Sequence, residues 1–339
     1  MVMKMLKIVE FIKANHNWRE LLSASPYNVT IKDDGGFTLL KYSQIDSDLN
    51  LELVRECRGL IIDSECNPVC VPFFKFGNYG EMYADKIDWS SAVVEEKIDG
   101  SLIKLWSHKS KWIVSTNGTI FAEKANIGSD NESELHISKS THYSNFADLF
   151  HTARQITGLD FEKLNPDFTY MLEVVSPYNR VVVPYSDIDL FHIGTRCNRT
   201  LQEIEIDIGV KKPRTFSCNN IDDLIEMAAQ LRYSEEGYVV KDKNYKRIKV
   251  KSPAYVAVHH LISGLNEKRL LELLRTNEVA EFLTYFPEYK PHVDELNAKI
   301  TRLIEEIDGI LQSKVDGVSY ETRKDFAAMA TQTRFPALL

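Results

Sequence analysis

The chain has 339 residues, of which 44% are hydrophobic and 27% are charged. This ordinary globular composition excludes a disordered, collagen-like or low-complexity protein, and a typical domain of about 150 residues suggests two domains. The net charge of −8 excludes a protein that coats nucleic acid through bulk positive charge, but it permits a local basic groove.

No run approaches the roughly 18 apolar residues of a membrane span, and the N-terminus lacks an apolar run that ends in a cleavage site. We therefore expect neither a membrane segment nor a secretory signal. The cysteines are odd in number and lack paired spacing, which argues against a disulfide framework. A reduced, cytoplasmic protein is the expectation.

The N-terminal and central parts predict a first helix followed mainly by strands. Residues 4–22 carry an apolar stripe at helical spacing, and Asp33–Gly36 is a turn. The strand candidates that follow are residues 60–62, 101–106, 112–116, 170–175, 180–183 and 189–193. Two helices are expected among them, at residues 144–157 and 221–231, with Asn220 as the N-cap of the second.

After Pro253 the pattern becomes helical. One long stripe is formed by Val293, Leu296, Ile300, Leu303, Ile304, Ile307 and Leu311. Further helices are expected at residues 266–275 and 320–331. The pattern therefore predicts the fold class α+β, with a domain of antiparallel sheets at residues 1–256 and a small all-α domain at 257–339.

Lys97 lies where a strand would deliver a lysine into a tight turn, because residues 95–101 (EEKIDGS) follow an apolar pair. A lysine amine is protonated and a poor nucleophile at neutral pH, but nearby cations or burial can free it to attack. Gly100 would let the backbone approach a phosphate closely. A strand end with a solvated lysine is the alternative that this segment alone leaves open.

A second strand candidate presents alternating cations. Residues 247–251 (RIKVK) would place Arg247, Lys249 and Lys251 on one face. Three like charges repel, so they need either an anion such as a polyphosphate or full solvation at a sheet edge. The preceding segment 235–240 (EEGYVV) predicts a hairpin that brings Glu236 beside the lysines, where a carboxylate can help to bind a divalent cation.

Glu173 interrupts an apolar strand at residues 170–175 (YMLEVV). A buried carboxylate is costly unless it is paired or hydrogen-bonded, so such a residue is a candidate for function. A glutamate on the solvent face of a half-buried strand is the alternative.

Together these elements resemble the covalent nucleotidyltransferase superfamily of polynucleotide ligases and RNA capping enzymes. The order is Lys-x-Asp-Gly at 97–100, a strand Glu at 173, Glu-Gly at 236–237 and Lys-x-Lys at 249–251. The chain most resembles the bacteriophage RNA ligase 1 family of ATP-dependent tRNA-repair RNA ligases. Ser101 follows the Asp-Gly, and residues 56–63 (ECRGLIID) and 176–182 (SPYNRVV) are similar to segments of that family.

The resemblance implies an ATP-grasp-like nucleotidyltransferase domain with a role for each matching residue. Lys97 would become lysyl-AMP, while Lys249 and Lys251 would act catalytically by holding the α-phosphate. Glu236, and with it Glu173, would bind the metal. The implied ATP-binding set is Tyr42, Arg58, Lys75, Asp99, Gly100, Glu173, Glu236, Lys249, Lys251 and Tyr255. Ordinary half-buried aromatics are the alternative for the two tyrosines.

The resemblance also implies a three-step reaction with ATP and Mg²⁺, for which Mn²⁺ can substitute. Lys97 would take AMP from ATP, AMP would pass to the 5′-phosphate of RNA, and a 3′-hydroxyl would displace AMP to seal the strand. The implied partners are RNA ends, tRNA among them, and an end-healing polynucleotide kinase/phosphatase. The host cytoplasm is the implied location if the protein is viral.

Two other classes of function stay open. A DNA ligase or mRNA capping guanylyltransferase uses the same lysine chemistry, but these usually have an arginine where this chain has Leu102 and an OB-fold where it is helical. A non-catalytic RNA-end-binding protein would have kept the pocket. The family often has a lysine where this chain has Asn117, and the C-terminal helices are either an RNA-specificity module or a helical domain with a mixed-charge surface.

Overall fold

The computed structural model describes residues 5–127, 143–262, 265–275, 279–310, 312 and 322–334. The chain divides into two compact units, of which unit 1 is residues 1–131 with 138–263 and unit 2 is residues 132–137 with 264–339. Helix α6 (Pro253–Ile262) runs across the boundary expected at 256–257 and stands in unit 1. Among the described helices, none has the length and apolar character needed to cross a membrane.

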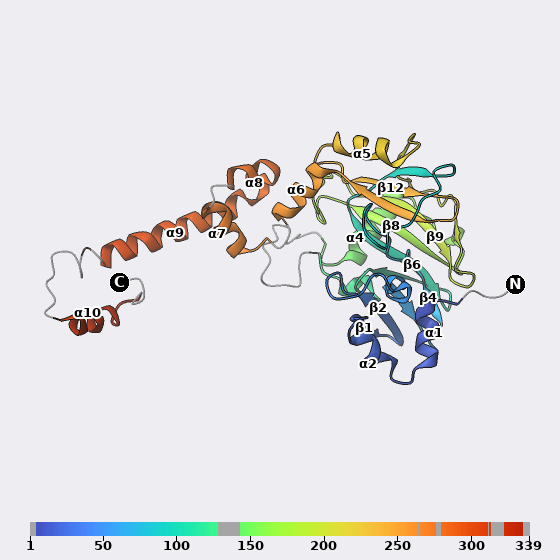
Figure 1. Ribbon diagram of the computed structural model, residues 1–339, viewed down its shortest axis with the longest axis horizontal. Coiled ribbons are helices and arrows are strands. Elements are labelled where there is room, and N and C mark those ends of the chain that lie inside the picture. The colour runs from blue at the N-terminus through green and yellow to red at the C-terminus, as the bar shows by residue number, and fades with distance from the viewer. Residues whose placement is uncertain are drawn as a thin grey trace. The chain divides into compact units, whose positions relative to one another are not determined.

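Unit 1 is built on three antiparallel sheets (Figure 1). Sheet A has the strand order β1-β2-β3-β4, sheet B the order β11-β5-β12-β13, and sheet C the order β10-β9-β8-β6-β7. The strands are β1 Val29–Asp34, β2 Phe37–Tyr42, β3 Arg58–Ile62, β4 Pro68–Cys70, β5 Val93–Glu96, β6 Ser101–His108, β7 Lys111–Thr116, β8 Phe168–Val175, β9 Asp189–Cys197, β10 Glu203–Ile204, β11 Thr215–Phe216, β12 Gly237–Lys241 and β13 Arg247–Lys251. The antiparallel sheets predicted from sequence are confirmed.

Helices pack against these sheets. In unit 1 they are α1 Lys7–Ala14, α2 Trp18–Ser23, α3 Glu52–Glu56, α4 Phe146–Thr157, α5 Ile221–Ala229 and α6, with 3₁₀ turns η1 Ala122–Lys124 and η2 Phe161–Lys163. Leu149 and Phe150 of α4 pack in the core of sheet C, and Leu224 of α5 packs in the core of sheet B. Asn145 and Asn220 cap α4 and α5 as the sequence predicts.

Two sequence predictions for unit 1 are wrong. The helix expected at 4–22 is two helices, because Asn15 is extended at the end of α1 and its side chain donates to the Phe11 carbonyl oxygen. The strand expected at 180–183 is a loop. The N–H groups of Val182 and Val183 donate to Asp99 Oδ2 at 2.9 and 2.8 Å. A side-chain carboxylate thus accepts hydrogen bonds that a neighbouring strand would otherwise accept.

Unit 2 is helical throughout its described residues. Its helices are α7 Glu267–Arg275, α8 Val279–Tyr285, α9 Lys290–Ile310 and α10 Arg323–Ala330, with the 3₁₀ turn η3 Pro287–Tyr289. The predicted stripe lies on α9, whose Val293 and Leu296 are buried; its last member, Leu311, lies outside the described residues, as do residues 320–321 of the last predicted helix. The predicted all-α class of this region is confirmed for the described part.

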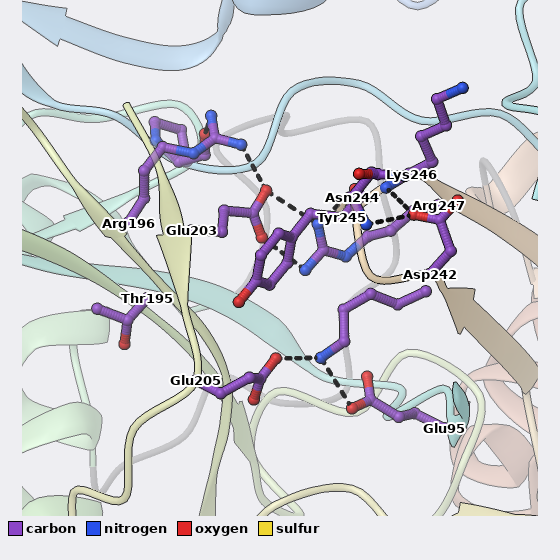
Figure 2. A network of polar contacts seen from close by, with 12 residues as sticks. Glu95, Thr195, Arg196, Glu203, Glu205, Asp242, Asn244, Tyr245, Lys246 and Arg247 are labelled. Atoms are coloured by element: carbon purple, nitrogen blue, oxygen red, sulfur yellow. Dashed lines mark hydrogen bonds and ion pairs between the residues drawn. The ribbon is translucent and has the colours of Figure 1, made fainter. Parts of the chain in front are cut away.

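A buried ion-pair network joins sheet B to sheet C (Figure 2). The Glu203 carboxylate lies 2.5 Å from Arg196 on β9 and 2.6 Å from Arg247 on β13, and the three side chains are only 5–6% exposed. Each guanidinium also lies over an aromatic ring, Arg247 over Phe73 at 4.2 Å and Arg196 over Phe74 at 4.1 Å. The network therefore fixes the 73–76 segment against both sheets.

We expect Glu203→Gln to lower the free energy of unfolding by about 3 kcal/mol or more, because it leaves two buried guanidinium groups without a carboxylate between them. The exposed pair Arg199–Asp167, also 2.5 Å apart, is the matched control. Asp167→Asn should cost less than about 1 kcal/mol, since solvent screens that pair. Chemical denaturation measures both variants, and equal losses would contradict the role given to Glu203.

Candidate active site

Lys97 lies directly after β5 and against the start of β12. Its N–H donates to the Gly237 carbonyl oxygen at 2.9 Å, and its Nζ lies 2.5 Å from Glu236 Oε2. The other carboxylate oxygen of Glu236 lies 3.0 Å from Lys251 Nζ. A carboxylate that is only 4% exposed thus bridges two of the lysines singled out from sequence. A nucleophilic role for Lys97 would require its ammonium to lose a proton and leave this carboxylate.

Asp99 holds the turn that follows Lys97. Its Oδ1 accepts a hydrogen bond from the Tyr255 hydroxyl at 2.7 Å, while its Oδ2 accepts the two N–H groups of the 182–183 loop. Burial, and then the nearby carboxylates, raise the pKa of Tyr255, so its hydroxyl stays a donor. Both oxygens of Asp99 are occupied by protein groups, which favours a role in fixing the turn over direct contact with a nucleotide.

Two glycines of the motifs are required by close backbone approach. A Cβ at Gly100 would overlap the carbonyl oxygen of Val174 on β8. Gly237 has φ +136°, and a Cβ there would overlap the carbonyl oxygen of Val250 on β13. In this structure, therefore, the space that Gly100 leaves open is used by a neighbouring strand.

A pocket of about 160 Å³ lies beside Lys97, lined by residues of sheets B and C together with Arg58 of sheet A and two phenylalanines of the 73–76 segment. On sheet B, Val239 stands opposite Lys249, and both line the pocket. On sheet C, Leu102 stands opposite Glu173, and both line it too. Strand register therefore brings a cation and a carboxylate from distant parts of the sequence to one cavity with Lys97.

The 73–76 segment (FFKF) supplies an aromatic ring to this pocket. The Phe76 centroid lies 5.6 Å from Arg58 Cζ and 5.4 Å from Lys249 Nζ, within the range of cation–π contacts. Lys75 is buried, and its Nζ lies 5.6 Å from the ring of Tyr42. Arg58 Nη1 is buried and has no hydrogen-bond partner among the described residues. A buried donor without a partner is typical of a group that a ligand satisfies.

The electrostatics of the pocket disfavour charge on two of its residues. Burial, followed by the neighbouring cations Lys75, Lys97 and Arg58, lowers the pKa of Lys249 to about 7. Burial raises the pKa of Glu173 to about 7, an effect that Lys97 opposes. An incoming phosphate would favour the charged form of Lys249, because an opposite charge stabilises a buried ammonium.

The residues present fit a divalent cation completed by phosphate oxygens. Glu236 acts on the pKa of Glu173, so the two carboxylates are close enough to interact. Mg²⁺ is typically held by one or two carboxylates together with substrate phosphates and waters. The described residues contain no cluster of three or more metal-ligating side chains, which argues against an all-protein metal cage within that part of the chain.

Residues 56–255 match the family model for RNA ligase of the T4 RNA ligase 1 type. The chain belongs to this RNA ligase family. The match confirms the resemblance to the bacteriophage RNA ligase 1 family. It spans the segments that carry Lys97, Glu173, Glu236 and the lysine pair at 249 and 251.

Two relatives and one solved structure illustrate the similarity. The chain is 30% identical to a putative bifunctional polynucleotide kinase/RNA ligase of Autographa californica nuclear polyhedrosis virus, over 80% of this chain but only 41% of that protein. It is 24% identical to an RNA ligase of Rhodothermus phage RM378, over 78% of this chain and 72% of that protein. The solved structure of a putative ATP-dependent DNA ligase from Aquifex aeolicus aligns with a TM-score of 0.47 and 15% identity. The alignment covers 92% of this chain and 85% of that chain.

The structure sorts the residues singled out from sequence into three groups. Arg58, Lys97, Glu173 and Lys249 line the pocket, and Glu236 with Lys251 adjoins it through the Lys97 ion pair. Tyr42 and Lys75 form a neighbouring pair. Asp99, Gly100 and Tyr255 fix the turn.

Two features of the site differ from expectation or were missed. Arg247 lines the pocket, but it is not a free third cation beside Lys249 and Lys251 because it is ion-paired with Glu203. Lys104 is completely buried, and its Nζ donates to the Gly59 carbonyl oxygen near Asn117. The sequence did contain a signal for Lys104, because it is a charged residue inside the apolar strand β6. The same kind of signal singled out Glu173 in β8.

The pKa of Lys249 predicts proton uptake when ATP binds. Above about pH 7 the lysine is largely neutral in the empty pocket, and a bound phosphate restores its charge. Without a divalent cation, Glu173 becomes charged over the same range and repels the anion. We therefore expect ATP affinity to fall as pH rises from about 7 to about 8, with net proton uptake.

Calorimetric titration in buffers of different ionisation enthalpy measures this uptake. Lys249→Arg keeps a permanent charge, so it should remove most of the uptake, while Glu173→Gln reports the share of the carboxylate. Proton uptake by Lys249→Arg equal to that of the wild type would show that another group is responsible.

Proposed function

We propose that this protein is an ATP-dependent RNA ligase that joins a 5′-phosphate to a 3′-hydroxyl through lysyl-AMP and RNA-adenylate intermediates. The observation that carries the proposal is the Lys97–Glu236–Lys251 arrangement beside a pocket lined by Arg58 and Lys249, inside the segment that matches the family. It combines a nucleophile with cations that can hold a phosphate.

In the first step, deprotonated Lys97 Nζ attacks the α-phosphorus of ATP. A P–N bond forms, the nitrogen releases one proton to solvent, the bond to pyrophosphate breaks, and pyrophosphate takes the electron pair. Lys249 and Lys251 stabilise the negative charge that develops on the phosphate oxygens. Glu236 and Glu173 would hold a Mg²⁺ or Mn²⁺ ion, which neutralises phosphate charge when bound.

In the second step, an oxygen of the RNA 5′-phosphate attacks the same phosphorus. The P–N bond breaks, and its electron pair returns to Lys97 Nζ, which then takes a proton that Glu236 can stabilise. In the third step, a 3′-hydroxyl attacks the 5′-phosphate of the RNA-adenylate, loses its proton and releases AMP. The product is a sealed phosphodiester.

RNA repair, with broken tRNA as one substrate, is the proposed setting. The baculovirus relative is described as a polynucleotide kinase joined to an RNA ligase, which supports an end-healing kinase/phosphatase as functional partner. The chain spans 41% of the length of that relative, so such an activity would have to come from another protein or segment.

Transfer of label from α-labelled ATP to the protein, with Mg²⁺ and without RNA, tests the first step. We expect the wild type and the exposed-lysine control Lys111→Ala to be labelled, and Lys97→Ala to be unlabelled, because only Lys97 is placed as the nucleophile. GTP in parallel tests the capping alternative. Label from GTP would favour a guanylyltransferase, and no label in folded protein that carries no AMP would favour a binding protein.

We further propose that unit 1 is the adenylyltransferase domain and that the helices of unit 2 contribute RNA specificity. A chain ending at residue 263, where unit 1 ends, should still label Lys97 but should lose sealing of a structured RNA. Gel assays of both activities on the same preparation measure this. Equal loss of labelling and sealing would count against a separate specificity role.

A further inference from the structure

A second pocket of unit 1 shares Lys249 with the pocket beside Lys97. It has a volume of about 480 Å³, and its lining includes Lys249, Lys251, His259 and His260. No aspartate or glutamate is among its described lining residues. A cavity walled by ammonium and imidazole groups favours an anionic ligand.

The segment at 77–79 forms a rigid wall of this pocket. The Tyr79 N–H donates to the Lys249 carbonyl oxygen at 2.8 Å, and the Lys249 N–H donates to the Gly77 carbonyl oxygen at 3.0 Å. These backbone hydrogen bonds attach the segment to β13 like an added strand. The position of Asn78 and Tyr79 relative to the lysine pair is therefore set by the backbone.

Asn78 offers an acceptor without a donor. Its Nδ2 donates to Glu81 Oε1 at 2.7 Å, and its backbone N–H donates to Glu81 Oε2 at 2.7 Å. The carboxylate of Glu81 can only accept hydrogen bonds, so the Asn78 side-chain amide cannot be flipped. Its Oδ1 therefore points away from Glu81. Oδ1 is buried and has no hydrogen-bond partner among the described residues. A sugar hydroxyl is a donor that could satisfy it.

Tyr79 is an aromatic residue with 51% of its surface exposed at this pocket. Exposed rings beside cations are typical of sites where a nucleobase stacks while lysines hold its phosphate. The β- and γ-phosphates of ATP would use the lysines too. Those two phosphates would contact neither the ring of Tyr79 nor Oδ1 of Asn78. A nucleotide of a nucleic-acid strand, which has a base and a sugar as well as a phosphate, would contact all of these groups.

We infer that this second pocket binds the phosphorylated 5′-terminal nucleotide of the strand that receives AMP, with its phosphate at Lys249 and Lys251 and its base against Tyr79. The inference rests on the proposed function for the reaction it serves. Because Lys249 lines both pockets, a phosphate held there is next to the cavity in which Lys97 carries AMP. Tyr79 and His260 are thereby assigned to recognition of the second substrate.

The test separates adenylylation from AMP transfer. Purified lysyl-AMP protein is mixed with a 5′-phosphorylated RNA oligonucleotide, and the single-turnover rate of RNA-adenylate formation is measured. We expect Tyr79→Ala to slow this step about tenfold, as expected for loss of base stacking, and Tyr79→Phe to leave it near wild type. His260→Gln should weaken transfer, while the exposed-residue control His16→Gln should not. Labelling of Lys97 by ATP should be unchanged in all of them.

A binding measurement keeps the test independent of the proposed function. Anisotropy of a labelled oligonucleotide on unreactive Lys97→Ala protein, with and without Tyr79→Ala, compares 5′-phosphate with 5′-hydroxyl ends. We expect tighter binding of the phosphate end and about tenfold loss on removal of the ring. Equal loss of labelling and transfer would assign the pocket to ATP instead. Unchanged transfer and unchanged binding would show that the strand end binds elsewhere.

Discussion

The site depends on one buried carboxylate between two lysines. Glu236 is only 4% exposed and contacts Lys97 and Lys251 through its two oxygens. The backbone on either side is tied to the same strands, since the Ser252 N–H donates to the Glu236 carbonyl oxygen and the Lys97 N–H to that of Gly237, both at 2.9 Å. A buried charge is stable only when it is paired. Removing Glu236 would therefore disturb the ends of β5, β12 and β13 together.

One carboxylate for two lysines leaves the site with excess positive charge, and the surrounding residues preserve that excess. Arg247 shares the Glu203 carboxylate with Arg196, and Lys241 is paired with Glu95 and Glu205, so these cations are held in ion pairs (Figure 2). Lys249 has the opposite surroundings, because the neighbours that act on its pKa after burial are cations. Arg247 and Lys241 thus form ion pairs within the protein, whereas Lys249 is the cation that can bind an anionic ligand.

Local sequence patterns predicted much of this arrangement. Alternation in 247–251 and the turn before it were sufficient to place Glu236 beside Lys251, because a hairpin fixes its own register. The loop at 180–183 could not be predicted in the same way. Its hydrogen-bond acceptor, Asp99, lies more than 80 residues away, and the partner of Arg247 lies 44 residues away. Contacts of that kind depend on how the sheets meet, which no local period encodes.

The position of Lys249 also implies an order of events. In the empty protein this lysine is largely neutral above about pH 7, so neither pocket then has its full positive charge. An α-phosphate in the first pocket would favour the protonated form, and the same ammonium would then face the second pocket. The strand end would consequently meet a stronger cation after AMP is attached to Lys97 than before it. Under the proposed function, Lys249 would therefore couple occupation of the first pocket to the charge that faces the second.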